Sequence, residues 1–341
     1  MSTATRVPET TAMDGQELSA DDAWTVLRRY RTARLAKDSF LRFRYGDGFT
    51  HARALALQLC LAIIPLAIAV VGLAGTLHQT KVAQVLTLTL EHFTPGASRD
   101  ALDETLRAGQ QRGGGGGTLA LTLGLVAALV SLTTAMGQVE RGANRIYGIE
   151  RDRPTARKYL RAFLHASTAG MPAMLGFVVI VNGGALGEAI ARVYARSSPP
   201  MLWTALRWPL GILLALASIT VLLKSAPRRR QPGYSWLAVG AAVALVLWVG
   251  FSLLLALYAS RSGTFGSIYG PLTGVFALLV WANLTSLAVF LGVAFSAQLE
   301  AVRAGVPRPA RVDPELVPAG RGDHPTLTHP ATSRQPRVAR H

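Results

Sequence analysis

Charge in this chain is confined to the segments between long apolar stretches, and this pattern constrains the fold more than any other feature. A helix of about 20 apolar residues crosses a hydrocarbon layer of ~30 Å. In lipid, backbone polar groups are satisfied only in helices or in closed β-barrels. The continuous apolar runs of this chain lack the alternating pattern of barrel strands, so we expect helices. Six stretches contain no Asp, Glu, Lys or Arg: Ala54–Leu77, Thr118–Val139, Ala162–Gly187, Trp208–Leu223, Gln231–Ser260 and Ser262–Leu299.

The predicted fold class is an all-α polytopic membrane protein. We expect six transmembrane helices, at about 54–77, 118–139, 162–186, 203–223, 235–259 and 271–297. Only 16% of the residues are charged, against about 25% in a typical soluble domain. Cys60 is the single cysteine, which excludes an intrachain disulfide and a thiolate-cluster metal site. The fourth stretch is the shortest, so its helix is expected to carry Arg207 at the membrane interface.

The basic residues predict the orientation of these helices, because cytoplasmic loops carry an excess of Lys and Arg. Of the 35 Lys and Arg residues, 27 fall before the first span, after the second, after the fourth or in the tail that follows the sixth, and eight fall on the opposite side. Both termini are therefore expected to be cytoplasmic. The formal net charge of +16 has the same origin.

The segments outside the spans give a provisional division of the chain. Residues 1–20 and 305–341 are predicted to be disordered tails around a membrane domain at 21–304. No cleavable signal peptide is apparent, because the first apolar run begins only at Ala54. Residues 21–43 are predicted to form an amphipathic helix, either on the inner membrane surface or packed under the bundle. Residues 78–117 are predicted to hold short extracytoplasmic helices.

The side chains do not indicate an enzyme. The seven histidines are scattered, and no nucleophile elbow, dinucleotide fingerprint or paired-carboxylate motif lies within a span. We therefore expect no catalytic residue, no metal and no cofactor. The basic clusters could neutralise phosphates, but the topology rule explains them better than a nucleic acid does. Membrane lipids are the expected partners, with anionic head groups at the cytoplasmic basic loops. The sequence leaves the oligomeric state open.

Neutral polar residues remain inside the predicted spans. Gln58 lies in the first span and Asn283 in the sixth, and each must find a partner in the bundle. Hydrogen bonding between helices and contact with a solute both remain open for these side chains. Pro65 interrupts the first span and Gly270-Pro271 opens the sixth. Broken helices can build a midplane site in transporters, although proline and glycine are also common in membrane helices generally.

Three stretches, in this order and spacing, resemble the YihY/virulence-factor BrkB family of bacterial inner-membrane proteins. They are Gly48–Leu73, Asn144-Arg145-Ile146-Tyr147-Gly148, and the run from Ile268-Tyr269-Gly270-Pro271 to Leu291-Gly292. The resemblance covers about residues 40–303 and implies a multi-pass protein of the bacterial cytoplasmic membrane, with six spans and both ends inside. It also implies a role in transport or in the cell envelope. One departure is that Ala294 and Ser296 stand where many relatives place a glutamate and an asparagine.

The resemblance and the polar residues together give the functional hypotheses. The leading one is a transporter of a small or amphipathic solute, with lipid among the candidates. The alternative is a non-transporting envelope scaffold that binds anionic lipid or protein partners. A ribonuclease label carried by some relatives finds neither a metal cluster nor an acid–base pair in this sequence. The hypothetical cavity-lining residues are Gln58, Pro65, Tyr269, Gly270, Pro271 and Asn283, and the hypothetical cytoplasmic loop motif is Asn144, Arg145 and Tyr147.

Overall fold

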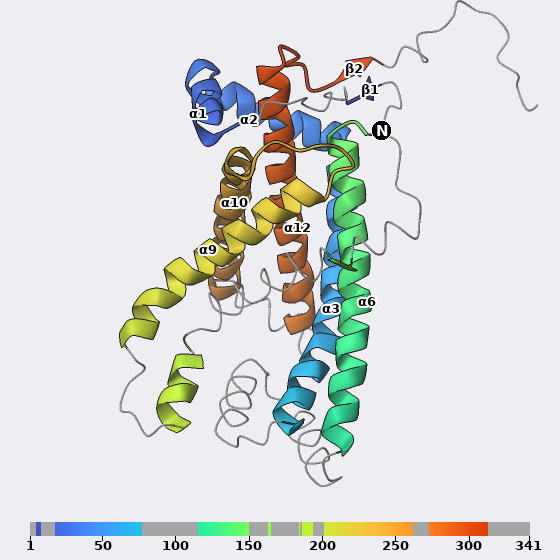
Figure 1. Ribbon diagram of the computed structural model, residues 1–341, viewed down its shortest axis with the longest axis vertical. Coiled ribbons are helices and arrows are strands. Elements are labelled where there is room, and N and C mark those ends of the chain that lie inside the picture. Colours follow the sequence, from blue (N-terminus) through green and yellow to red (C-terminus); the bar gives the residue numbers. More distant parts are fainter. Residues whose placement is uncertain are drawn as a thin grey trace, which may run out of the picture.

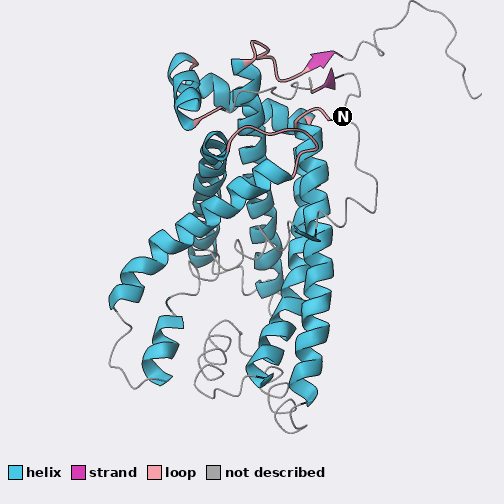
Figure 2. Ribbon diagram, in the orientation of Figure 1, coloured by secondary structure: helices cyan, strands magenta, loops and turns pink. Residues whose placement is uncertain are grey.

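The computed structural model describes residues 5–7, 18–76, 115–149, 163–164, 184, 186–193, 201–261 and 273–312. Five long helices dominate this part of the chain (Figure 1). They are α3 (Gly48–Thr76), α6 (Gly115–Ile146), α9 (Met201–Ser225), α10 (Tyr234–Arg261) and α12 (Thr273–Arg303). Figure 2 shows that strands are confined to one short pair in the described residues.

Four of the described helices are long and apolar enough to cross a membrane, at Leu121–Ile146, Met201–Ser225, Tyr234–Arg261 and Val275–Arg303. The first predicted span corresponds to α3, whose Gly48–Ile63 portion forms a shorter apolar segment. Most of the third predicted span, 162–186, and the loop at 78–114 lie outside the described residues. The helical membrane fold is therefore observed, while the count of six spans and the orientation of the termini stay predictions.

The long helices pack around α12. Helix α12 contacts α10 and α3, α9 packs on α10, and α6 packs on α3 (Figure 1). Helix α6 lies against α3 along much of its length because small residues bring the two backbones together. A Cβ added at Gly124 of α6 would lie 2.9 Å from the carbonyl oxygen of Pro65 and 2.9 Å from Cα of Ala69. Pro65 therefore lies inside a continuous helix, at a point of close contact with α6.

The contact between α10 and α12 also relies on small residues, which often allow membrane helices to pack closely. A Cβ added at Gly292 would lie 2.6 Å from the Cβ of Ala244 and 2.8 Å from the carbonyl oxygen of Gly240. A Cβ added at Gly240 would in turn overlap the hydroxyl of Ser296. Glycine at positions 240 and 292 therefore sets the separation of the two helices.

The predicted single helix over residues 21–43 is wrong, because the structure has two helices there: α1 (Ala20–Arg29) and α2 (Thr32–Tyr45). A capping box between Ser19 and Asp22 starts α1. The backbone is extended at Tyr30, with ψ of 131°, and leaves the helical conformation at Arg31, with ψ of 119°. This break allows α1 to contact α10 while α2 packs on α12. One face of α2 is thus packed under the bundle, and its opposite face is exposed.

The first and last described segments lie at the same end of the bundle as α1 and α2 (Figure 1). Strand β1 (Thr5–Arg6) pairs antiparallel with β2 (Arg311–Val312). Both strands fall in segments that the sequence predicted to be disordered. The ends of α6, α9 and α12 and the starts of α3 and α10 lie at this end too. We call it the basic end, because the sequence places its basic clusters in these segments.

Candidate functional site

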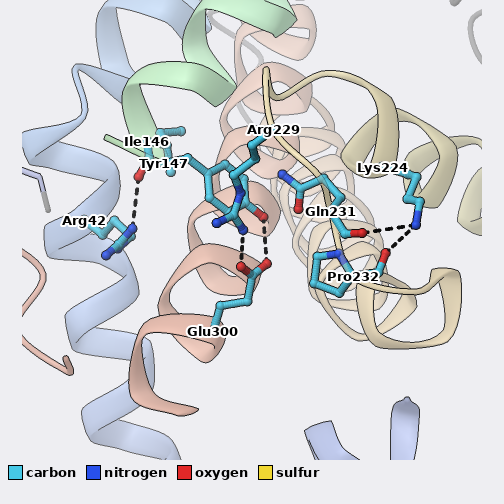
Figure 3. A network of polar contacts seen from close by, with 8 residues as sticks. All are labelled: Arg42, Ile146, Tyr147, Lys224, Arg229, Gln231, Pro232 and Glu300. Atoms are coloured by element: carbon cyan, nitrogen blue, oxygen red, sulfur yellow. Dashed lines mark hydrogen bonds and ion pairs between the residues drawn. The ribbon is translucent and has the colours of Figure 1, made fainter. Parts of the chain in front are cut away.

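A buried polar cluster joins four segments at the basic end (Figure 3). We call it the basic-end network and define it as Arg42 of α2, Tyr147 just after α6, Arg229 of the α9–α10 connection, and Glu300 near the end of α12. Arg42 and Tyr147 are fully buried, and the side chains of Arg229 and Glu300 are each only 5% exposed. Charged groups buried this deeply are rare unless they are paired.

Glu300 is the centre of the network. Its carboxylate forms an ion pair with the guanidinium of Arg229 and accepts a hydrogen bond of 3.4 Å from the hydroxyl of Tyr147. The guanidinium carbon of Arg229 also lies 4.2 Å from the centre of the Tyr147 ring, in a cation–π contact. Burial raises the pKa of the Tyr147 hydroxyl well above its usual range, so this group stays a neutral donor at physiological pH.

Arg42 connects α2 to the rest of the network. Its Nε donates to Oε1 of Gln298 at 3.0 Å, and its Nη1 donates to the carbonyl oxygen of Ile146 at 3.3 Å. Gln298 also contacts the segment that follows α12, because its Nε2 donates to the carbonyl oxygen of Pro307 at 2.7 Å. Burial lowers the pKa of Arg42 to about 10, and the group remains charged at neutral pH.

The predicted motif at Asn144, Arg145 and Tyr147 belongs to this end, but Asn144 and Arg145 lie in the last turn of α6 and not in a loop. The helix continues past the predicted span end because charge marks the membrane boundary and not the helix end. Asn144 is buried, and its Oδ1 accepts a hydrogen bond of 2.7 Å from the backbone N–H of Arg228. Arg145 is exposed. Gly148 follows with φ of 80°, a conformation that favours glycine, and turns the chain away from the helix.

Asn144 and its neighbour allow a matched test of this contact. Asn144→Ala is expected to lower the free energy of unfolding by about 0.5–1.5 kcal/mol, because it removes the buried side-chain acceptor of the Arg228 backbone N–H. Arg145→Ala, on the exposed side of the same turn, should change it by less than about 0.5 kcal/mol. A denaturant titration in detergent micelles compares the two, and equal effects would show that the Asn144 contact is not stabilising.

The predicted polar residues of the bundle lie further from the basic end. The hydroxyl of Thr134 on α6 donates to Oε1 of Gln58 on α3 at 2.8 Å. Oδ1 of Asn283 on α12 is buried and has no hydrogen-bond partner among the residues that the structure describes. Two residues from Asn283, the indole N–H of Trp281 donates to the hydroxyl of Ser252 on α10 at 3.3 Å. Gln58 therefore already has one bond between helices, whereas the amide of Asn283 keeps a free acceptor.

Gln58 and Asn283 lie at similar depths in the bundle. Helices α3 and α12 run antiparallel, with His51 beside Phe290 near the basic end and Cys60 beside Leu278 further in. Interpolation between these two contacts places Gln58 opposite a position within about one helical turn of Asn283. The other predicted cavity residues, Tyr269, Gly270 and Pro271, lie outside the described residues.

Sequence reasoning missed Arg42, Arg229 and Glu300. The two arginines belong to basic clusters that the topology rule already accounted for, and Glu300 was placed at a span end. One sequence signal could have identified Arg42. It follows Leu35 and Ser39 at helical spacing, so it lies on the side of α2 that is buried. A cation on a buried helical face requires an anionic or carbonyl partner.

The network holds four segments together and has no free nucleophile that is accessible to a substrate. Among the described residues, no group of three or more His, Cys, Asp or Glu side chains could hold a metal ion. These contacts are structural: the carboxylate of Glu300 on α12 binds both the α9–α10 connection and the end of α6.

A family model described as virulence factor BrkB matches residues 39–315, which is most of the chain and includes all four residues of the network. The chain belongs to the BrkB family. It is 24% identical over 266 residues to a protein of Bacillus subtilis (strain 168) named "Putative ribonuclease-like protein YfkH", covering 77% of this chain and 94% of that protein. No solved structure matches significantly.

Further relatives of this BrkB-family chain are named as membrane proteins. It is 28% identical over 300 residues to the UPF0761 membrane protein Smlt0865 of Stenotrophomonas maltophilia (strain K279a), covering 84% of this chain and 66% of that protein. It is 24% identical over 279 residues to a UPF0761 membrane protein of Xanthomonas campestris pv. campestris (strain B100), covering 81% of this chain and 63% of that protein. The chain thus spans slightly less than two thirds of these two relatives. The family and the apolar helices together make this chain a membrane protein.

Proposed function

We propose that this chain is a transporter of the bacterial cytoplasmic membrane that moves a small or amphipathic solute, with lipid among the candidates. The observation that carries the proposal is the buried Oδ1 of Asn283, which has no hydrogen-bond partner in the described part of the chain. Other buried side chains there also lack a partner, Thr285 and Ser296 among them, but Asn283 is the one amide of this set that lies within a long helix. A buried acceptor left unpaired costs about 1–3 kcal/mol, so it needs a compensating role. A polar group on a solute would supply its missing donor.

The position of Asn283 supports a solute contact. It lies within about one helical turn of the depth of Gln58, which bonds to Thr134, so α3, α6 and α12 each place a neutral polar group near this level. Ser252 of α10 bonds to Trp281 of α12, which places this part of α10 beside Asn283.

The basic-end network also supports the transporter proposal, because its contacts could open and close one end of the bundle. It joins α2, the end of α6, the α9–α10 connection and α12 at the end of the bundle that the positive-inside rule assigns to the cytoplasm. A transporter must open and close such an end, and a set of ion pairs and hydrogen bonds between segments can separate without unfolding any helix. We therefore assign the network as the cytoplasmic gate.

The alternative is the envelope scaffold, in which the bundle stays closed and the basic end binds anionic lipid or protein. A scaffold needs no polar level inside the membrane, and the free acceptor of Asn283 favours the transporter. The name of the Bacillus relative includes a ribonuclease, an activity that would require a metal or an acid–base pair. The described residues contain no candidate metal cluster.

A thermal-shift screen of purified protein against lipids, ions and small metabolites tests the solute contact. A ligand at 100 times its dissociation constant stabilises the folded state by about 2.7 kcal/mol. We expect the shift to disappear in Asn283→Leu and to persist in Thr122→Val, which removes an exposed hydroxyl of α6 that bonds only to its own helix. A ligand shift that is equal in both variants would show that Asn283 does not contact the solute.

A further inference from the structure

The exposed face of α2 carries aromatic and basic side chains at helical spacing. Lys37, Phe40 and Arg44 follow one another at intervals of three and four residues, so they share one face, and Tyr45 lies beside them. All four are exposed, with Phe40 at 46% and Tyr45 at 42%. The opposite face of α2 is buried against the bundle, so this outward face is not required for packing.

This face is continuous with the apolar exterior of α3. The ring of Phe40 lies 6.3 Å from the ring of Phe49 in an edge-on contact, and Phe49 belongs to the first turn of α3. Along α3, the side chains of Arg53, Leu57 and Leu61 follow at intervals of four residues and are exposed. An exposed leucine stripe on a membrane helix faces lipid, so Arg53 and Phe40 lie where that stripe begins.

A second aromatic–basic pair lies at the same end on a different helix. Tyr234 opens α10 and is 58% exposed, and the ammonium of Lys224 lies 5.2 Å from the centre of its ring. Aromatic rings with cations beside them are typical of the level where a bilayer meets water, because the rings suit the head-group region and the cations attract lipid phosphates. The ammonium of Lys224 also donates to the carbonyl oxygens of Gln231 and Pro232, at 3.2 and 2.7 Å, so the ring of Tyr234 is the part of this pair that is presented at the exterior.

We propose that Lys37, Phe40, Arg44 and Tyr45 form a binding surface for an anionic bilayer, with the rings at the head-group level and the two cations on lipid phosphates. Charge favours this occupant. Lys37 and Arg44 are exposed and carry two positive charges, while Asp38, the acidic residue next to Lys37, pairs with Tyr30 and Arg34. The surface is independent of the proposed solute contact, so it would also exist in a scaffold.

Site-directed labelling in nanodiscs tests this surface with the full chain. Cys60→Ala removes the single cysteine, and Phe40→Cys then carries a fluorescent label. The matched control is Ala304→Cys, which is exposed just past the end of α12 and lies off this surface. Nitroxide-labelled phosphatidylglycerol and nitroxide-labelled phosphatidylcholine are the quenchers in the bilayer, and iodide is the quencher in water. Unchanged melting temperatures in detergent verify that both labelled variants are folded.

We expect both lipid nitroxides to quench the label at position 40 and to leave the label at position 304 unaffected. The anionic quencher should be several-fold more effective than the neutral one, and Lys37→Gln with Arg44→Gln should bring the two quenchers close to equal effectiveness, because these two cations supply the attraction to the lipid phosphates. If iodide quenches both labels equally and the lipids quench neither, the face points into water and a protein partner would be its occupant. Equal quenching by the two lipids at position 40 would overturn the assignment of an anionic bilayer.

Discussion

Replacement of Glu300 by leucine is expected to lower the free energy of unfolding by about 3–5 kcal/mol. The change removes the carboxylate that pairs with Arg229 and accepts from Tyr147, so a buried guanidinium loses its counter-ion. The measurement is a denaturant titration of the purified protein in detergent, followed by circular dichroism. The expected effect is large because both side chains are only 5% exposed. Water cannot reach the guanidinium of Arg229 to replace the lost carboxylate.

Two variants control this result. Arg303→Gln breaks the pair between Arg303 and Asp22, whose side chains are about one third exposed, and should cost no more than about 1 kcal/mol. The double change Arg229→Met with Glu300→Leu replaces the buried pair by apolar side chains and should recover part of the loss. A Glu300→Leu variant as stable as Arg303→Gln would show that the network does not hold the basic end together.

Replacement of Gly292 by leucine is the second large expected effect. A Cβ at this position already lies 2.8 Å from the backbone oxygen of Gly240 and 2.6 Å from the Cβ of Ala244. Because the backbone of α10 cannot move locally, α10 and α12 must separate, at a cost of about 1–3 kcal/mol or more. Gly250→Leu is the matched control, since a Cβ at Gly250 meets nothing within 4 Å. Equal melting temperatures for the two variants would contradict the close helix contact.

The membrane helices could be predicted from the sequence because lipid imposes a simple requirement on them. The predicted spans at 203–223 and 235–259 lie within two residues of α9 and α10 at each end. The predicted span end at 139 lies inside α6, which continues through Glu140 and Arg141 to Ile146. Charged residues leave the membrane without leaving the helix, so hydropathy gives the boundary of the span only.

The basic-end network could not be predicted, because its contacts join residues far apart in the chain. Arg42 bonds to Gln298, and Arg229 pairs with Glu300. The positive-inside rule explained every basic cluster at the level of the membrane, and it does not distinguish a solvated arginine from a buried one. The polar residues inside the spans were identified, since few side chains of that kind are present there. Whether these residues contact a solute depends on how the helices pack, which the spacing of residues in the sequence does not show.

Accessibility of position 283 from the two sides of the membrane tests the central claim most directly. In a Cys60→Ala background, Asn283→Cys is exposed to a small membrane-impermeant thiol reagent in vesicles of each orientation. Ala304→Cys provides the reactive control and Ala288→Cys, fully buried on α12, the unreactive one. A transporter predicts reaction at position 283 from at least one side, with more from the cytoplasmic side when Glu300→Gln loosens the gate. No reaction from either side, in either background, would contradict the proposal and favour a closed scaffold.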